Sequence, residues 1–367
     1  MKKCCYLLAL LCSLVLASAL FSNCSGDDDD SDDSGNPSDD DAADDDTGNV
    51  DDDNLNDDAT DDDSGDDDTT PPEPPADPGN PGPFGFGEEQ MTFHDPSSNK
   101  DQPLRVYYPS ADGGLTIDDA SGPRPLIIFG PGFSAPMNIY FSYGRHLASY
   151  GYVVVFRNNY VISHADLATT TSAIIDWVQE QESLPGSLFH GKLDFNRIGA
   201  SGHSMGGKIS LLTAYNDDRV KASATIDPVD MSPLPTPAYP SVTPELMPDI
   251  HIPTLLIGSS DGGSCAPVDE NYHQYFLYAN PPSIEIQILN SGHVTFCDLP
   301  DAIISGAALI CPTGGGDYEQ IRFLARRYVT AFYKVVFEGE SGYGYYLTGD
   351  GIAQDVADGL VTTDTKP

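Results

Sequence analysis

Positively charged side chains are scarce in this sequence. Its 367 residues include 17 Lys and Arg against 57 Asp and Glu, which gives a formal net charge of −40. Residues 25–82 contain no Lys or Arg, and the sequence after them is also acidic and shows no basic patch. Proteins that bind nucleic acid or anionic membrane surfaces through charge need such a patch. The composition therefore argues against both as partners.

Motifs for metals and cofactors are lacking as well. The sequence has no Cys-x-x-Cys pair and no His-x-x-x-His pair, which are spacings typical of zinc sites. The acidic run at residues 61–68 suggests calcium, but it lacks the ligand spacing and the terminal Glu of an EF-hand loop. We therefore expect no metal site and no cofactor.

A long apolar run occurs near the N-terminus, at residues 6–21, after two lysines. It is shorter than a typical transmembrane helix and has the pattern of a secretory signal peptide. Cleavage after Ala17–Ala19 would release a plainly secreted protein. The segment that ends at Cys24 resembles a bacterial lipobox, although two of its positions depart from that pattern. We favour a lipoprotein signal peptide at residues 1–23, with a lipid on Cys24 as the membrane anchor.

This signal predicts an extracytoplasmic protein, either a bacterial outer-membrane or cell-surface lipoprotein or a secreted one. Residues 24–82 follow as an acidic stretch of Asp, Ser, Gly, Asn and Pro without apolar periodicity. Such a segment cannot bury enough apolar surface to offset the entropy of ordering. We predict a disordered tether at residues 24–82.

Residues 83–367 have a different composition and suffice for one large domain. Strand-like apolar runs alternate there with helix-like segments, which predicts a mostly parallel sheet covered on both faces. The expected strands are 91–93, 104–108, 125–129, 152–156, 197–200, 222–226, 254–257 and 284–289. The expected helices are 140–150, 167–181, 205–215, 270–278 and 317–336.

The sequence Gly202-His203-Ser204-Met205-Gly206 directly follows one of these strands. A Gly-x-Ser-x-Gly motif between a strand and a helix places the serine on a sharp turn with its hydroxyl exposed. The two glycines relieve backbone crowding at that turn. Ser204 is therefore the candidate nucleophile.

A serine nucleophile needs a base and an oxyanion hole. His293 follows the expected strand 284–289, and the chain order of serine, acid and then histidine matches that of a hydrolase triad. The two N–H groups of the oxyanion hole are expected from Met205, at the start of its helix, and from Phe133, in the loop after strand 125–129.

These motifs resemble those of the α/β-hydrolase superfamily, from about residue 103 to residue 337. Gly130-Pro131-Gly132-Phe133 and the serine motif are similar to those of bacterial cutinases and polyester hydrolases. Gly206-Gly207-Lys208, Ile226-Asp227-Pro228-Val229-Asp230 and Cys265-Ala266-Pro267 resemble chlorophyllases. The resemblance implies the α/β-hydrolase fold and a serine esterase.

The two likenesses differ on the acid of the triad. Asp227 ends strand 222–226 and has the chlorophyllase-like position, whereas Asp261 follows strand 254–257 and has the cutinase-like position. We favour Asp227, keep Asp261 as the alternative, and interpret Asp230 as a structural turn residue.

The domain contains three cysteines, Cys265, Cys297 and Cys311. In an oxidising compartment three thiols suggest one disulfide and one free cysteine. Pairing of Cys297 with Cys311 would close a Gly-rich loop, and pairing of Cys265 with Cys297 would join two loops near the expected active site.

The sequence thus predicts an extracytoplasmic serine hydrolase that cleaves a small-molecule or polymeric carboxylic ester through an acyl-enzyme. A phospholipid or thioester hydrolase would use the same residues. A non-catalytic binding module on the same fold is the alternative from another class.

Overall fold

The computed structural model describes residues 73–160, 163–231 and 236–367. The predicted signal peptide, Cys24 and the tether up to residue 72 lie outside the described residues. No helix within the described ranges is long and apolar enough to cross a membrane.

A nine-stranded sheet forms the centre of the described domain, in the order β1-β2-β4-β3-β5-β6-β7-β8-β9. The six neighbouring strands β4, β3, β5, β6, β7 and β8 run parallel to one another. Strands β1, β2 and β9 pair antiparallel with their neighbours. The strands are β1 (Phe86–Asp95), β2 (Lys100–Pro109), β3 (Arg124–Gly130), β4 (Val153–Phe156), β5 (Leu193–His203), β6 (Val220–Ile226), β7 (Thr254–Asp261), β8 (Ser283–Gly292) and β9 (Val361–Lys366).

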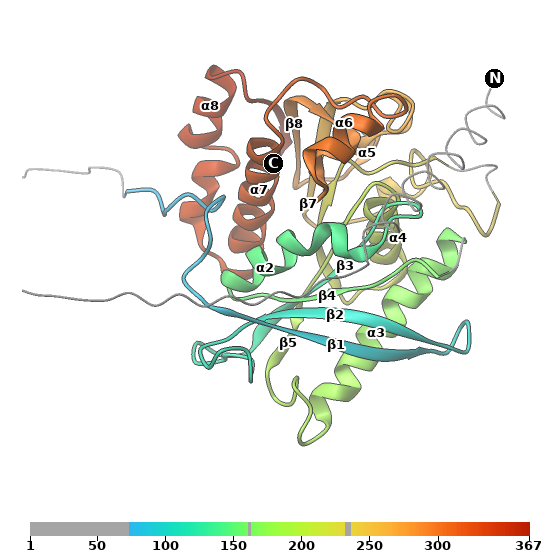
Figure 1. Cartoon of the computed structure of the whole chain (residues 1–367), viewed down its shortest axis with the longest axis vertical. Coiled ribbons are helices and arrows are strands. Elements are labelled where there is room, and N and C mark those ends of the chain that lie inside the picture. The colour runs from blue at the N-terminus through green and yellow to red at the C-terminus, as the bar shows by residue number, and fades with distance from the viewer. Residues whose placement is uncertain (1–72, 161–162, 232–235) are drawn as a thin grey trace, which may run out of the picture. The chain divides into compact units, whose positions relative to one another are not determined.

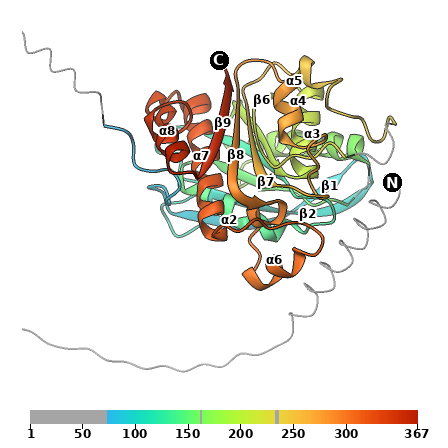
Figure 2. The same ribbon diagram turned by 90° about the horizontal axis from the view of Figure 1, so that it is seen from above.

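Helices cover both faces of this sheet (Figures 1 and 2). On one face lie α2 (Phe141–Ser149) and α7 (Tyr318–Glu338), and on the other lie α3 (His164–Ser183), α4 (Met205–Asn216) and α5 (Tyr272–Tyr278). Strands β3 and β4 are buried along their whole length because both of their faces are covered. Two short helices, α6 (Asp301–Ala307) and α8 (Asp350–Ala357), complete the C-terminal part.

The predicted elements are all present, and the differences have physical reasons. Strands β1 and β2 form a hairpin of two ten-residue strands rather than the short strands expected, because β1 carries polar, exposed side chains that interrupt the apolar pattern. Helices α6 and α8 were not predicted, because they bury only two and three residues and their sequences therefore show little apolar periodicity. Strand β9 has four consecutive exposed residues, so its sequence lacks the alternation that marks a half-buried strand.

The boundary of the tether also differs from the prediction. Residues 74–82, assigned to the tether, contact the domain through specific polar bonds. The carboxylate of Asp77 pairs with Arg327 of α7, and the Pro78 carbonyl accepts a hydrogen bond from His146 at 2.8 Å. Tyr150 and Tyr346 bind further carbonyls of this segment. These contacts supply ordering energy that composition alone does not reveal.

Candidate active site

Ser204 lies on the turn between β5 and α4, as its motif predicts. Its φ of +56° and ψ of −124° are an unusual backbone conformation for a residue with a side chain. The turn crowds the backbone, since a Cβ on Gly202 or Gly206 would collide with the Gly130 carbonyl. The Ser204 N–H donates to Ile226 of β6 at 2.9 Å, which ties the turn to the neighbouring strand.

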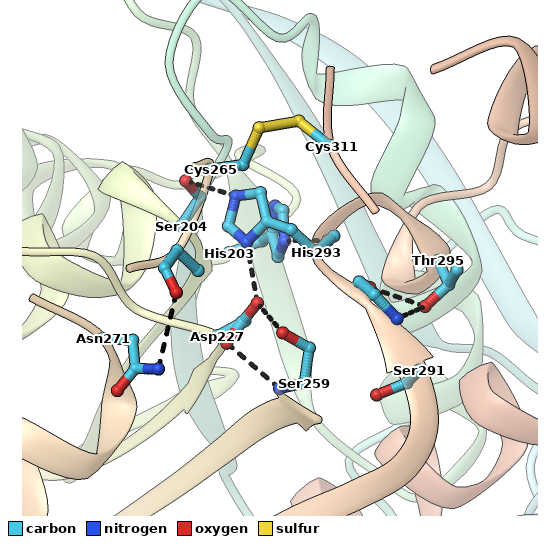
Figure 3. A network of polar contacts seen from close by, with 12 residues as sticks. His203, Ser204, Asp227, Ser259, Cys265, Asn271, Ser291, His293, Thr295 and Cys311 are labelled. Carbon is cyan, nitrogen blue, oxygen red and sulfur yellow. Dashed lines mark hydrogen bonds and ion pairs between the residues drawn. A yellow bond between two sulfur atoms is a disulfide. The ribbon is translucent and has the colours of Figure 1, made fainter. Parts of the chain in front are cut away.

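His293 begins the short 3-10 helix η3 (His293–Phe296) at the end of β8. Its ring bridges two side chains that directly follow different strands (Figure 3). Nε2 lies 2.9 Å from the Ser204 hydroxyl oxygen, and Nδ1 lies 2.7 Å from Oδ2 of Asp227. Because a carboxylate can only accept, Nδ1 carries the proton and Nε2 is free to accept from the serine.

Asp227 ends β6 and is fully buried, with a positive φ of +44°. Its carboxylate accepts from the Ser259 hydroxyl at 2.7 Å and from the Ser259 N–H at 3.1 Å. Burial opposes ionisation, but the bonds from His293 and Ser259 outweigh it and hold the pKa of Asp227 below its usual value. A buried carboxylate therefore stays charged beside the imidazole.

The other two candidate aspartates lie elsewhere. Asp261 is exposed at the end of β7, and its carboxylate has no hydrogen bond to His293. Asp230 is buried and forms an ion pair of 2.8 Å with Lys208. It also accepts from the N–H groups of Val242 and Thr243, at 2.9 and 2.8 Å. These contacts give Asp230 a structural role.

The predicted oxyanion donors lie beside Ser204. Met205 is the first residue of α4, and N–H groups in the first turn of a helix lack partners within it. In the loop after β3, a Cβ on Gly132 would lie 3.4 Å from the Cβ of Ser204. The Gly132 N–H points to the Tyr140 hydroxyl at 3.4 Å, whereas the N–H of Phe133 donates to no other described residue.

Sequence reasoning missed the contacts of His203, which precedes the nucleophile. Its Nε2 donates to the His293 carbonyl at 2.9 Å, and its Nδ1 accepts from the Tyr140 hydroxyl at 2.9 Å. Its ring centre lies 4.5 Å from that of His293. Burial and the neighbouring His293 lower the pKa of His203 to about 3, so the ring is neutral. No sequence signal separates this residue from the ordinary variable position of the motif.

Neither predicted disulfide pairing is correct. The bond joins Cys265 to Cys311 (Figure 3), with 5.5 Å between their Cα atoms. Cys297 is free and buried. Cys265 lies in the loop between β7 and α5, and Cys311 lies in the loop between α6 and α7. The Cys297 thiol lies 3.7 Å from the Tyr140 hydroxyl. Burial raises the pKa of that thiol to about 12, which keeps it protonated.

Within the described ranges no group of His, Cys, Asp and Glu side chains is arranged to hold a metal ion. The arrangement of Ser204, His293 and Asp227 can instead activate a hydroxyl as a nucleophile without any further group.

Comparison with known proteins shows the family of this chain. The family model described as Chlorophyllase matches residues 86–350. This chain belongs to the chlorophyllase family. Its mostly parallel sheet with helices on both faces is the α/β-hydrolase fold, as the sequence predicts.

Three curated relatives are similar over parts of the chain. A bis(hydroxyethyl) terephthalate hydrolase of Streptomyces coelicolor is 28% identical over 180 residues, which are 48% of this chain and 49% of that protein. Chlorophyllase-1 of Arabidopsis thaliana is 24% identical over 255 residues, 62% of this chain and 76% of that protein. Cutinase est1 of Thermobifida alba is 26% identical over 171 residues, 46% and 52% of the two chains. The match therefore spans about half the length of two of these relatives.

Proposed function

We propose that this member of the chlorophyllase family is a serine hydrolase of carboxylic esters. The observation that carries the proposal is the bridge made by the His293 ring. Its Nε2 faces the Ser204 hydroxyl at 2.9 Å and its Nδ1 faces Asp227 at 2.7 Å. This is the geometry with which a serine gives up its proton as it attacks a carbonyl. All three relatives carry names of enzymes from this group, which supports the same chemistry.

The proposed reaction has two halves. The Ser204 oxygen forms a bond to the ester carbonyl carbon while His293 Nε2 takes the hydroxyl proton. The N–H groups of Phe133 and Met205 donate to the negative oxygen of the tetrahedral intermediate. The ester C–O bond then breaks, and the leaving alcohol takes the proton from His293.

Water resolves the acyl-enzyme through the same groups. His293 removes a proton from the water while the water oxygen attacks the acyl carbon. The bond between this carbon and the Ser204 oxygen then breaks, and the Ser204 oxygen takes the proton from His293. Throughout both halves Asp227 holds the imidazole in one tautomer and stabilises its charged form. The products are a carboxylic acid and an alcohol.

We propose that the reaction takes place outside the cytoplasm. The apolar run at residues 6–21 supports export, and Cys24 supports a lipid anchor. The disulfide between Cys265 and Cys311 supports an oxidising compartment as well. Detergent partition of the wild type and of Cys24→Ser tests the anchor: loss of the hydrophobic fraction is expected, and equal partition would contradict it.

Ester hydrolysis by Ser204→Ala tests the enzyme proposal. The purified wild type is expected to hydrolyse members of a panel of carboxylic esters, and Ser204→Ala is expected to lose at least ~10³-fold in kcat. A fluorophosphonate should label the wild type and should not label the variant, which identifies the Ser204 hydroxyl oxygen as the nucleophile. A wild type that neither cleaves an ester nor reacts with the probe would instead be a binding module.

A further inference from the structure

The loop that carries the proposed oxyanion donor Phe133 is held by side chains from the segment that follows the neighbouring strand. Strand β4 lies beside β3, and the chain continues from its end into Arg157. The Arg157 N–H donates to the Phe129 carbonyl at 3.1 Å, which extends the pairing of the two strands by one residue. Arg157 and Asn159 therefore emerge beside the loop at residues 130–133.

Asn159 makes two bonds to this loop. Its Nδ2 donates to the Gly132 carbonyl at 2.7 Å and to the Pro131 carbonyl at 3.2 Å. Its Oδ1 accepts from Nη1 of Arg157 at 2.6 Å. The orientation of the amide follows from these partners, because the opposite one would set its oxygen against two carbonyls and its nitrogen against a guanidinium.

The bond to Gly132 acts on the peptide unit that supplies the oxyanion donor. The Gly132 carbonyl and the Phe133 N–H belong to one planar trans amide, in which the C=O and N–H point in opposite directions. A donor that fixes the oxygen therefore also fixes where the N–H points. Hydrogen bonding at the oxygen polarises the amide and strengthens its N–H as a donor.

Arg157 is an unusual residue for this place. Its side chain is among the most buried in the described domain, yet no described carboxylate lies within ion-pair distance of it. Its guanidinium lies against the loop, since a Cβ on Gly130 would be 2.5 Å from Nη2. Burial lowers its pKa to about 9, so it stays charged at neutral pH. A buried charge without a counterion is costly for stability, which calls for a compensating role.

We propose that Arg157 and Asn159 are positioning residues for the oxyanion hole, acting through the peptide between Gly132 and Phe133. Arg157 polarises the Asn159 amide, and Asn159 polarises and aims the loop peptide whose N–H receives the oxyanion. The negative charge that develops on the intermediate then meets a positive charge already buried behind the loop. This inference rests on the proposed function.

Asn159→Asp tests the proposal with almost no change in shape. The variant keeps an oxygen for Arg157 but loses both donors to the loop, and its carboxylate neutralises the guanidinium. We expect kcat to fall on the order of 10²-fold with KM nearly unchanged, as for loss of an oxyanion donor. The affinity for a boronic acid, which adds to Ser204 and imitates the tetrahedral intermediate, should fall by a similar factor. A purely structural role would change thermal stability without this selective loss.

Asn158→Asp is the matched control. It adds the same charge one residue earlier, where the side chain accepts from the Met137 N–H at 3.4 Å and faces the Tyr160 hydroxyl. We expect it to keep the kcat and boronate affinity of the wild type. If Asn159→Asp does not fold, Asn159→Ser decides, because a serine hydroxyl is too short to bind both carbonyls.

Three results separate the two proposals. A folded Asn159 variant with the kcat and boronate affinity of an active wild type overturns the positioning role and leaves the proposed function intact. Equal losses in Asn158→Asp and Asn159→Asp overturn it as well, because the effect would then be one of charge alone. A wild type without esterase activity overturns the proposed function itself.

Discussion

Asp227 and Asp230 stand on the same loop after β6, and both are buried, but their partners differ. Asp227 faces a histidine at 2.7 Å and a serine, whereas Asp230 faces a lysine at 2.8 Å and two backbone N–H groups. A neutral imidazole has one nitrogen that donates and one that accepts a proton, whereas an ammonium group only donates hydrogen bonds. One loop thus supplies a carboxylate to the proposed chemistry and another to the fold.

The largest effect is expected from Asp227→Asn. The amide keeps the shape but removes the charge that stabilises imidazolium, and it favours the wrong tautomer of His293. We expect kcat to fall ~10⁴-fold with a small change in the free energy of unfolding. Steady-state kinetics with an ester substrate, together with thermal unfolding, measures both. Retention of more than a tenth of the activity would remove Asp227 from the triad.

Asp230→Asn should have the opposite profile. It removes the carboxylate that pairs with the fully buried Lys208 ammonium at 2.8 Å, and breaking a buried pair costs about 3–5 kcal/mol. We expect a lower urea midpoint, while the protein that remains folded keeps a kcat near that of the wild type. Addition of Lys208→Met should recover part of the stability. A large loss of kcat in a stable Asp230→Asn protein would contradict the contrast.

The two histidines at this site extend the comparison to pH. His293 has a carboxylate neighbour, whereas His203 has a tyrosine hydroxyl, a carbonyl and a folded pKa of about 3. Unfolding restores a pKa near 6.5, so the unfolded state binds the extra proton as the pH falls below that value. His203 therefore costs the protein stability in acid.

His203→Gln measures this cost. The amide can still donate to the His293 carbonyl but does not titrate. Between pH 6.5 and pH 5 the wild type should lose about 2 kcal/mol relative to the variant in urea unfolding. Comparison of the two proteins at each pH cancels the other titrating groups. An equal dependence on pH in both proteins would show that His203 takes up its proton over the same pH range in the folded and unfolded states.

The sequence predicts more of the proposed site than of its surroundings. Ser204, His293 and the two oxyanion candidates follow from positions at strand ends, because the sheet brings the carboxyl ends of parallel strands to one edge. The choice between Asp227 and Asp261 depends on a ring orientation that spacing does not encode. The pairing of Cys265 with Cys311 depends on two loops whose meeting is set by tertiary packing.

The prediction that the tether extends to residue 82 differs from the structure for a related reason. Residues 74–82 look like the tether in composition, but Asp77 meets Arg327, which is distant in sequence. Strand β9 was missed because a polar edge strand gains its order from pairing with β8 rather than from burial. In both cases the stabilising partner is distant in sequence, so the local sequence pattern does not predict the contact.

Asp261→Asn should have the smallest effect, and it tests the alternative candidate for the acid that Asp227 is proposed to supply. Its carboxylate is exposed at the end of β7, and the paired residue on β8 is Gly292, directly before His293. Loss of an exposed charge there should change kcat by no more than about twofold. It should change the free energy of unfolding by no more than about 0.5 kcal/mol. A loss comparable to that of Asp227→Asn would mean that His293 turns toward Asp261 during the reaction. With Asp261→Asn active and Asp227→Asn inactive, the proposed acid is the buried carboxylate at the end of β6.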